Sequence, residues 1–242
     1  MEKISVCIAT YNGELYIEDQ LDSILKQLRP NDEIIISDDS STDRTIEIIK
    51  ALRDTRIKIF HSSHRNLILN FENAIEKASG DIIFLSDQDD IWYPNKIEIL
   101  LNKLENYDLV FTNLNIFNEN IKNSQAMFPV DKDYNNVFLN FVKNHCVGAT
   151  MAFKAHLLKY ALPIPKNIEM HDMWIYLIGA TYGKTFYYRQ PLIYYRRHDS
   201  NASNTGGKTT NSLLEIIKIR ITWIKVLLKR MEKIRKHNKN IK

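Results

Sequence analysis

Three aspartates stand close together after a short apolar run. The run is Ile-Ile-Phe-Leu at 82–85, and the acids are Asp87, Asp89 and Asp90. Carboxylates at this spacing repel one another unless a cation or strong hydrogen-bond donors compensate their charge. Mg²⁺ and Mn²⁺ prefer oxygen ligands and are often held by one or two carboxylates together with substrate phosphates. The spacing indicates half of a metal site that a phosphate ligand completes, with an acidic loop that caps the next helix as the alternative.

The first 90 residues alternate between two kinds of pattern. Runs rich in β-branched residues predict strands at 4–9, 33–37, 57–60 and 82–85. Apolar residues spaced three and four apart predict helices at 14–28, 43–52 and 67–78. This alternation predicts an α/β fold, with a parallel sheet and helices on both of its faces.

Polar turns follow three of these strands. Thr10, Tyr11 and Asn12 follow the first strand, and Asp38 and Asp39 end the second. The three aspartates follow the fourth. Ligands of parallel sheets bind outside the carboxyl ends of the strands. A single pocket at this edge is therefore favoured over three unrelated turns.

The second half of the chain is less regular. Strands are expected at 109–112, 147–153, 185–188 and 192–195, and helices at 94–106 and 171–179. Residues 113–145 are rich in asparagine and show no clear period. We expect the loops of this region to determine substrate specificity.

Composition restricts the class of protein. The chain has 242 residues, a net charge of +4 and two cysteines, Cys7 and Cys146. Two cysteines make neither a disulfide framework nor a Cys/His zinc site. The sequence has no signal-peptide pattern and no apolar stretch of about 18 residues, so a cytoplasmic protein is expected.

Five motifs, taken in order, resemble those of family 2 glycosyltransferases with the GT-A fold. The motifs span Ser5–Asn12, Ile36–Asp43, Ala78–Asp90, His171–Trp174 and Tyr195–His198. The resemblance covers about residues 3–200, and its details are similar to bacterial transferases that build O-antigen, capsule or rhamnose-containing glycans. It implies a mainly parallel GT-A sheet, a UDP- or dTDP-sugar donor, Mn²⁺ or Mg²⁺, and inverting transfer to a glycan or lipid-linked glycan.

The resemblance also implies which residues bind the donor nucleotide: Thr10, Tyr11, Asn12, Asp39, Asn66 and Asp87. Asp39 would accept the N3–H of uracil or thymine, and Asn73 is a further candidate for the base or ribose. Asp87 would bind the ribose or a metal-bound water. A core role for the Tyr11 ring is the alternative.

Metal and diphosphate ligands follow from the same resemblance. Asp89 and His198 would hold the cation, and Arg196 and Arg197 would pair with diphosphate oxygens. Surface positions are the alternatives for these three basic residues. Gly206-Gly207 would act as the hinge of a closing loop.

Inverting transfer requires a general base, and Asp172 matches it. The alternative for Asp172 is a helix N-cap. His171 would orient the base, and Trp174 would either line the acceptor site or lie in the core. Asp90 would cap the next helix or contact the sugar.

The C-terminal segment differs from the rest. The boundary is placed at 207, so that 1–207 form the catalytic domain and 208–242 a basic helical tail with a net charge of +9. Its apolar residues alternate in steps of three and four: Leu214, Ile217, Ile221, Ile224, Leu228 and Met231. This face would pack on the domain, bind an anionic membrane through 213–236, or form a dimer seam.

Two other functions compete with glycosyl transfer. A nucleotidyltransferase on a similar sheet usually carries a glycine-rich, basic loop after its first strand, whereas this chain has Thr-Tyr-Asn-Gly at 10–13. A nucleic-acid-binding protein is suggested only by the basic tail. The remainder of the chain, 1–207, carries a net charge of −5, which disfavours nucleic acid as a partner.

Overall fold

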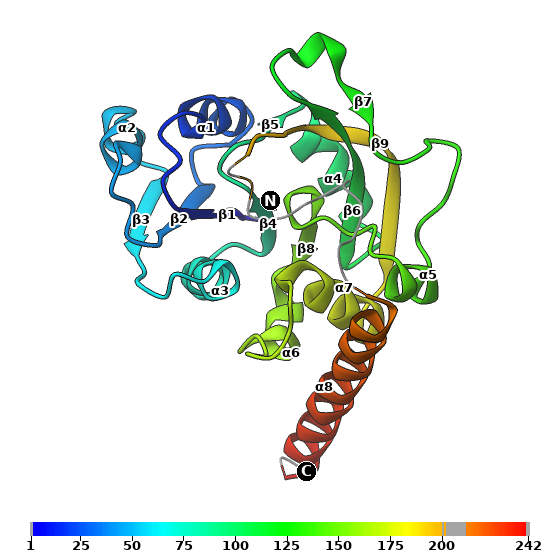
Figure 1. The fold of residues 1–242 in the computed structure, drawn as a ribbon. Helices are drawn as coiled ribbons and strands as arrows, with labels where there is room; N and C mark the ends of the chain where they lie inside the picture. Colours follow the sequence, from blue (N-terminus) through cyan, green and yellow to red (C-terminus); the bar gives the residue numbers. More distant parts are fainter. Residues whose placement is uncertain (1, 200, 202–211, 241–242) are drawn as a thin grey trace.

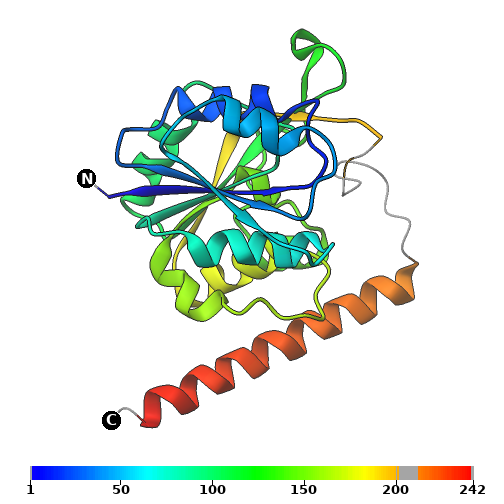
Figure 2. The same cartoon turned by 90° about the vertical axis from the view of Figure 1, so that its left-hand side faces the viewer.

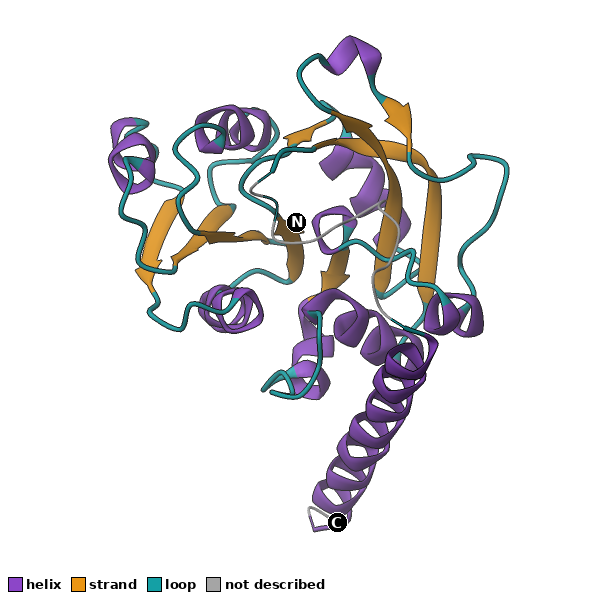
Figure 3. Cartoon of the chain, in the orientation of Figure 1, coloured by secondary structure: helices purple, strands orange, loops and turns teal. Residues whose placement is uncertain are grey.

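One sheet of nine strands forms the centre of the computed structural model (Figures 1 and 3). The structure describes residues 2–199, 201 and 212–240. Gly206 and Gly207, the expected hinge, lie outside the described residues. The strand order is β3-β2-β1-β4-β8-β6-β9-β5, and β7 pairs with β6.

The first half of the fold follows the predicted alternation. Its strands are β1 (Ile4–Thr10), β2 (Glu33–Asp38), β3 (Ile57–His61) and β4 (Ile82–Ser86). Its helices are α1 (Ile17–Leu25), α2 (Thr45–Ala51) and α3 (Leu67–Lys77). The pairs β1–β2, β1–β4 and β2–β3 are all parallel, so the carboxyl ends of these strands meet at one edge.

The second half is mixed rather than parallel. Its strands are β5 (Ile91–Trp92), β6 (Leu109–Phe117), β7 (Gln125–Ala126), β8 (Ala152–Lys154) and β9 (Thr185–Arg196). Its helices are α4 (Lys96–Leu104), α5 (Val137–Val142), α6 (Leu158–Ala161) and α7 (His171–Tyr182). Strands β6 and β9 pair in parallel, whereas β8 runs antiparallel to β4 and β6, and β5 runs antiparallel to β9. The expected parallel pairing therefore holds throughout the first half and for β6–β9, and the remaining pairs of the second half are antiparallel.

Two strand predictions were wrong in detail. The apolar run 147–153 is not one strand, because a 3₁₀ turn at Gly148–Thr150 precedes β8. The two late strands are one long strand, β9, which pairs with β6 across an irregularity where Asn113 faces Pro191. Proline has no N–H to donate to the ladder, which explains why the sequence reads as two strands.

Two hydrophobic layers cover the sheet, one on each face. Alternate residues point to opposite sides of a strand. Cys7, Ile35 and Ile83 belong to the layer of α3 and α7, whereas Val6 and Ile34 belong to the layer of α1 and α4. Both layers hold the loops at the carboxyl edge against a rigid sheet.

The C-terminal helix α8 (Leu213–Asn240) runs along one side of the domain (Figure 2). It packs on the domain through Trp223, which is 3% exposed, with Ile219, Val226 and Leu227 around it. The face with Ile221 at its centre is exposed, so the first of its three alternatives, packing on the domain, is wrong. Among the described residues, no helix is both long and apolar enough to cross a bilayer.

Candidate active site

A cleft of about 330 Å³ opens at the carboxyl ends of β1, β2 and β4. Residues from both halves of the fold line it: Ala9, Thr10, Tyr11, Asp39, Arg65, Asn66, Leu67, Asn70, Asp87, Gln88, Asp89, Val147, Gly148, Met170, His171, Asp172, Tyr195 and Asn201. The structure therefore brings together most residues predicted from the sequence. Of those predicted, Asn12, Asn73, Asp90, Trp174, Arg196, Arg197 and His198 do not line it.

Asp39 supplies a free acceptor on one wall of the cleft. Its side chain is nearly buried, and its Oδ2 accepts the backbone N–H of Asn66 at 2.9 Å. Its Oδ1 is buried and has no hydrogen-bond partner within the described part of the chain. A buried acceptor without a partner is costly, so this oxygen is suited to a ligand N–H.

Hydrogen bonds within the fold fix the backbone at Thr10. Asn70 donates from Nδ2 to the carbonyl of Thr10 at 3.1 Å, and the Thr10 hydroxyl donates to Asp38 Oδ1 at 3.0 Å. Asp38 also accepts the N–H of Ser41 at 2.9 Å and so supports the turn after β2. Sequence reasoning missed Asn70, because an asparagine inside a helix gives no local signal of its contact.

Tyr11 is half exposed at the mouth of the cleft, so the core role considered for its ring is wrong. The side chain of Gln88 holds its backbone, accepting from the N–H at 2.9 Å and donating to the carbonyl at 3.0 Å. This pair of bonds joins the loop after β1 to the acidic loop after β4. The sequence analysis assigned no role to Gln88.

Two candidates for the nucleotide site, Asn12 and Asn73, make contacts within the fold and do not line the cleft. Asn12 adopts a left-handed backbone with φ of 48°, and its Oδ1 accepts the N–H of Thr42 at 2.8 Å. Asn73 donates to Ser37 Oγ at 2.7 Å and does not line the cleft. Asn66 lines the cleft, while its Oδ1 caps α3 by accepting the N–H of Leu69.

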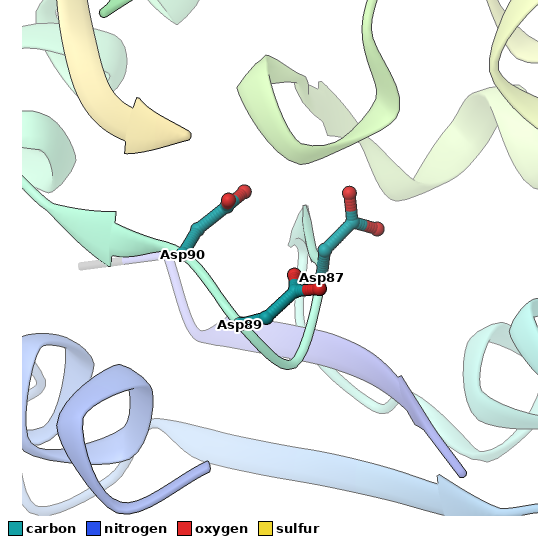
Figure 4. A group of neighbouring side chains, drawn as sticks. All are labelled: Asp87, Asp89 and Asp90. Atoms are coloured by element: carbon teal, nitrogen blue, oxygen red, sulfur yellow. The ribbon is translucent and has the colours of Figure 1, made fainter. Parts of the chain in front are cut away.

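The acidic cluster lies on the loop between β4 and β5 (Figure 4). One ligand oxygen from each of Asp87, Asp89 and Asp90 lies within 4.8 Å of the others. His198 Nε2 lies 2.9 Å from Asp89 Oδ2, and Asn201 donates to the same oxygen at 3.2 Å. The two predicted metal ligands, 109 residues apart, are thus in direct contact.

Burial and mutual repulsion shape the electrostatics of this cluster. Burial, with the charges of Asp89 and Asp172, raises the pKa of Asp87 to about 7. Burial also raises the pKa of Asp89 and that of Asp90 above their usual range. A site that disfavours the charged form of several carboxylates at once has a negative electrostatic potential, which attracts a divalent cation. Oxygen ligands of this kind suit Mg²⁺ or Mn²⁺.

Asp90 does not cap the next helix and does not line the cleft. It is fully buried, accepts the backbone N–H of Arg196 at 3.2 Å, and leaves its second oxygen without a partner in the described chain. Helix α4 begins six residues later, at Lys96, and its N-cap position is Asn95, so Asp90 does not cap it. Its carboxylate instead ties the acidic loop to the end of β9.

Lys96 provides an internal counter-charge that the sequence analysis missed. It is fully buried, donates from Nζ to the carbonyl of Ala149 at 2.7 Å, and lies 3.8 Å above the ring of Trp92. Burial lowers its pKa to about 7, while the charges of Asp90 and Asp87 act in the opposite direction. Lysines are usually exposed, and a lysine in the first turn of a helix is expected at the surface. The sequence alone therefore does not predict that Lys96 is buried.

Arg196 holds the acidic loop rather than facing the cleft. Its Nε donates to the carbonyl of Asp89 at 3.0 Å, and its guanidinium lies between the rings of Tyr16 and Phe117, at 4.8 and 4.9 Å. Arg197 lines a second cleft of about 1000 Å³, next to β6 and β7. His198 stacks on Tyr16 at 4.6 Å, which fixes its ring beside Asp89.

Asp172 faces the acidic cluster across the first cleft. Its side chain is nearly buried, and burial raises its pKa to about 6. The cap position of α7 is Met170, without a side-chain hydrogen bond, so Asp172 is not the N-cap of this helix. A Cβ on Gly148 would lie 3.0 Å from His171 Nε2, so glycine at 148 lets the preceding turn approach the start of α7.

His171 and Trp174, at the start of the same helix, are also buried. His171 is buried, stacks on Phe71 at 4.0 Å, and both of its ring nitrogens lack partners in the described chain. Burial lowers its pKa to about 3, so its ring is neutral. Trp174 is fully buried and donates to the carbonyl of Ala161 at 2.8 Å, so the core alternative is correct and the acceptor-wall alternative is wrong.

Comparison with solved structures identifies the fold. TarS residues 1–349 from S. aureus, in complex with UDP-GlcNAc, superpose with a TM-score of 0.71 at 18% identity, covering 92% of this chain and 66% of that one. The mannosyltransferase PcManGT from Pyrobaculum calidifontis, in complex with GDP-Man and Mn²⁺, superposes with a TM-score of 0.61 at 20% identity, covering 78% and 55%. The chain has the GT-A fold and spans two thirds or less of these structures.

Sequence comparison identifies the family. The family model described as "Glycosyl transferase family 2" matches residues 5–161. The dTDP-rhamnosyl transferase RfbG of Shigella flexneri is 33% identical over 217 residues, covering 80% of this chain and 72% of the relative. The chain belongs to glycosyl transferase family 2 and is a glycosyltransferase, which decides against the nucleotidyltransferase alternative.

Proposed function

We propose that this chain transfers a sugar from a UDP- or dTDP-sugar to a hydroxyl of a growing bacterial surface glycan. The observation that carries the proposal is one cleft lined by a free acceptor at Asp39, an acidic cluster and a buried carboxylate at Asp172. The name of RfbG specifies a dTDP-rhamnosyl donor. A glucosyltransferase of Escherichia coli, WfgD, is 31% identical over 140 residues, 57% of this chain and 55% of the relative, and its name specifies UDP-Glc and a diphosphoundecaprenol-linked acceptor.

The acidic loop forms the leaving-group end of the cleft. Asp89 and His198 would hold Mn²⁺ or Mg²⁺, and Asp87 would bind the ribose or a metal-bound water. A cation bound there stabilises the negative charge that grows on the departing diphosphate. Lys96 lies behind the loop and balances part of the charge of its carboxylates. Arg196 and Asp90 fix the loop against β9, so the ligands are held before the donor arrives.

Asp172 would act as the base on the opposite wall. The acceptor oxygen attacks the anomeric carbon and forms the new glycosidic bond, while the bond from that carbon to the diphosphate oxygen breaks. The hydroxyl proton goes to a carboxylate oxygen of Asp172, and the nucleoside diphosphate leaves with the electron pair. Attack from the face opposite the leaving group would invert the anomeric centre, the outcome that the family resemblance implies.

A screen of nucleotides tests this function directly. The melting temperature of the protein is measured with UDP, dTDP, GDP and their sugars in the presence of Mn²⁺, because a ligand of the native state raises it. We expect a uridine or thymidine nucleotide to raise it most, and the matching sugar nucleotide to release nucleoside diphosphate when an acceptor glycan is added. If no nucleoside diphosphate stabilises the protein with Mn²⁺, the proposal is wrong.

Replacing Asp39 should weaken nucleotide binding selectively. In Asp39→Ala the acceptor for the base N–H is lost, and we expect the Kd for UDP to rise about 10- to 100-fold, as for a hydrogen bond to a charged group. Isothermal titration calorimetry measures the change. Asp22→Ala, at an exposed carboxylate on α1, is the matched control and should bind UDP as the wild type does. An unchanged Kd in Asp39→Ala would remove Asp39 from the nucleotide site.

A further inference from the structure

Helix α8 has two apolar faces, and only one of them is used in the fold. The inner face carries Trp223, buried among Ile219, Val226 and Leu227. Arg230 secures it by donating to the carbonyl of Leu162 at 2.9 Å, with its guanidinium 5.2 Å from the ring centre of Trp174. The helix is therefore fixed on the domain without any contribution from its outer side.

The outer face is an apolar stripe exposed to solvent. Its five residues are Leu214, Ile217, Ile221, Ile224 and Leu228, which are 71%, 47%, 45%, 47% and 59% exposed. Steps of three and four place them on one side of the helix. At about 100° per residue, Trp223 lies about 160° from Ile221, so the stripe faces away from the domain. A contiguous exposed row of this kind marks an interaction surface rather than scattered surface residues.

Helix α5 extends this stripe on one side. Arg220 donates to the carbonyl of Val142 at 3.1 Å, which places α5 beside the N-terminal half of α8. The exposed apolar residues of α5 are Val137, Phe138, Leu139 and Val142, and Phe138 is 73% exposed. Figure 1 shows α5 next to the start of α8. The two helices together present one apolar surface.

Lysines border the stripe on its other side. Lys218, Lys225 and Lys229 are exposed, and each lies about 40–80° around the helix from the centre of the stripe. None of the three forms an ion pair with an acid in the described part of the chain. Between 213 and 240 the chain has nine lysines and arginines and two glutamates, a net charge of +7.

This charge decides between the possible occupants. In a dimer through the stripe, the bordering lysines of the two copies would face one another, and two helices of the same sign would repel. An anionic bilayer complements both features, because its headgroups attract the lysines while the Leu and Ile side chains enter the interface. The helix would then lie in the plane of the membrane.

We propose that the outer face of α8, with the exposed residues of α5, binds the surface of a membrane that contains anionic lipids. The proposal goes beyond the proposed function, since it holds whichever sugar is transferred. Docking on this side leaves the domain attached through Trp223 and Arg230. The enzyme would then act next to a membrane without a spanning segment in its described residues.

Cosedimentation of the full chain with vesicles tests the proposal. We expect the protein to sediment with phosphatidylcholine vesicles that contain phosphatidylglycerol, to remain in solution with phosphatidylcholine alone, and to be released by salt. Two variants should each lower the partition coefficient at least about tenfold. They are the double variant Ile217→Ser/Ile224→Ser and the triple variant Lys218→Gln/Lys225→Gln/Lys229→Gln.

A matched triple variant separates local charge from net charge. Lys26→Gln/Lys50→Gln/Lys122→Gln removes three exposed lysines elsewhere and should bind vesicles as the wild type does. The thermal shift of every variant with a nucleotide and Mn²⁺ reports on the cleft separately, so failure here is distinct from failure of the proposed function. Equal binding by wild type and the α8 variants would overturn the proposal. So would a dimer in sedimentation velocity that Ile217→Ser/Ile224→Ser returns to a monomer, since a second copy would then cover the stripe.

Discussion

Asp89→Ala is expected to abolish cation-dependent sugar transfer, lowering kcat/KM by about a thousandfold or more, which corresponds to about 4 kcal/mol of transition-state stabilisation. Asp89 is nearly buried, contacts His198 at 2.9 Å and shares its site with two other carboxylates. Its removal takes away the one carboxylate that both lines the cleft and contacts the second predicted ligand. Turnover of the sugar nucleotide at several Mn²⁺ concentrations measures the effect.

Metal binding gives this prediction a second readout. We expect Mn²⁺ to raise the melting temperature of the wild type and to leave that of Asp89→Ala unchanged, because ligands that bind the native state stabilise it. Asp22→Ala, with an exposed carboxylate removed, should respond to Mn²⁺ as the wild type does. Mn²⁺-dependent turnover retained in Asp89→Ala would show that the cation is held elsewhere.

The sequence predicted the carboxyl edge well, because its signals are local. Each of β1, β2 and β4 is a short run of buried residues followed directly by polar ones, and the rule for parallel sheets then places those turns together. Asp39 and Asp87 lie in one cleft for this reason. Contacts between distant segments have no such signal. The pairing of Asp89 with His198 was implied by family resemblance, and no spacing along the chain predicts it.

Residues that support the site through contacts with distant segments were not predicted from the sequence, because such contacts leave no local signal. Asn70 and Lys96 both lie in helices, where local pattern assigns asparagine and lysine to the surface.

The face of α8 that packs on the domain could not be predicted either. Both faces of α8 satisfy a helical period, and the stripe through Ile221 is the longer one. Trp223 and Arg230 decide which face docks, because a large ring and a guanidinium fit the surface formed by α6 and α7.

Asp172→Asn is expected to lower kcat about 100- to 10,000-fold and to make the protein more stable at the same time. Loss of a base that accepts a proton in the transition state costs a factor of about 100 to 10,000. Binding of UDP with Mn²⁺ should stay intact, because the role proposed for Asp172 is to accept a proton from the acceptor hydroxyl rather than to bind the donor. Single-turnover rates and calorimetry on the same preparation measure the two effects.

The gain in stability follows from the raised pKa of Asp172. Burial moves its pKa from 3.8 to about 6, so the folded state binds the proton more tightly than the unfolded state does. The contribution of this group is therefore fully present below 3.8 and is lost as the pH rises through about 6. Above that pH the charged carboxylate lowers the free energy of unfolding by about 3 kcal/mol, at 1.36 kcal/mol per pKa unit. Asp172→Asn removes this cost, and its melting temperature should exceed that of the wild type above pH 6 but not near 3.8.

The pH profile of the wild type completes the test of Asp172. The carboxylate must be deprotonated to accept the proton, so kcat/KM should rise about tenfold per pH unit below about 6 and level off above it. Asp172→Glu, which keeps the carboxylate but moves it, should retain part of the activity and the same direction of pH dependence. A residue with a purely structural role predicts the opposite combination, in which Asp172→Asn loses stability and keeps its turnover. A buried carboxylate that costs stability and shares a cleft with an acidic cluster is a candidate for catalysis, and the two measurements together distinguish that role from a purely structural one.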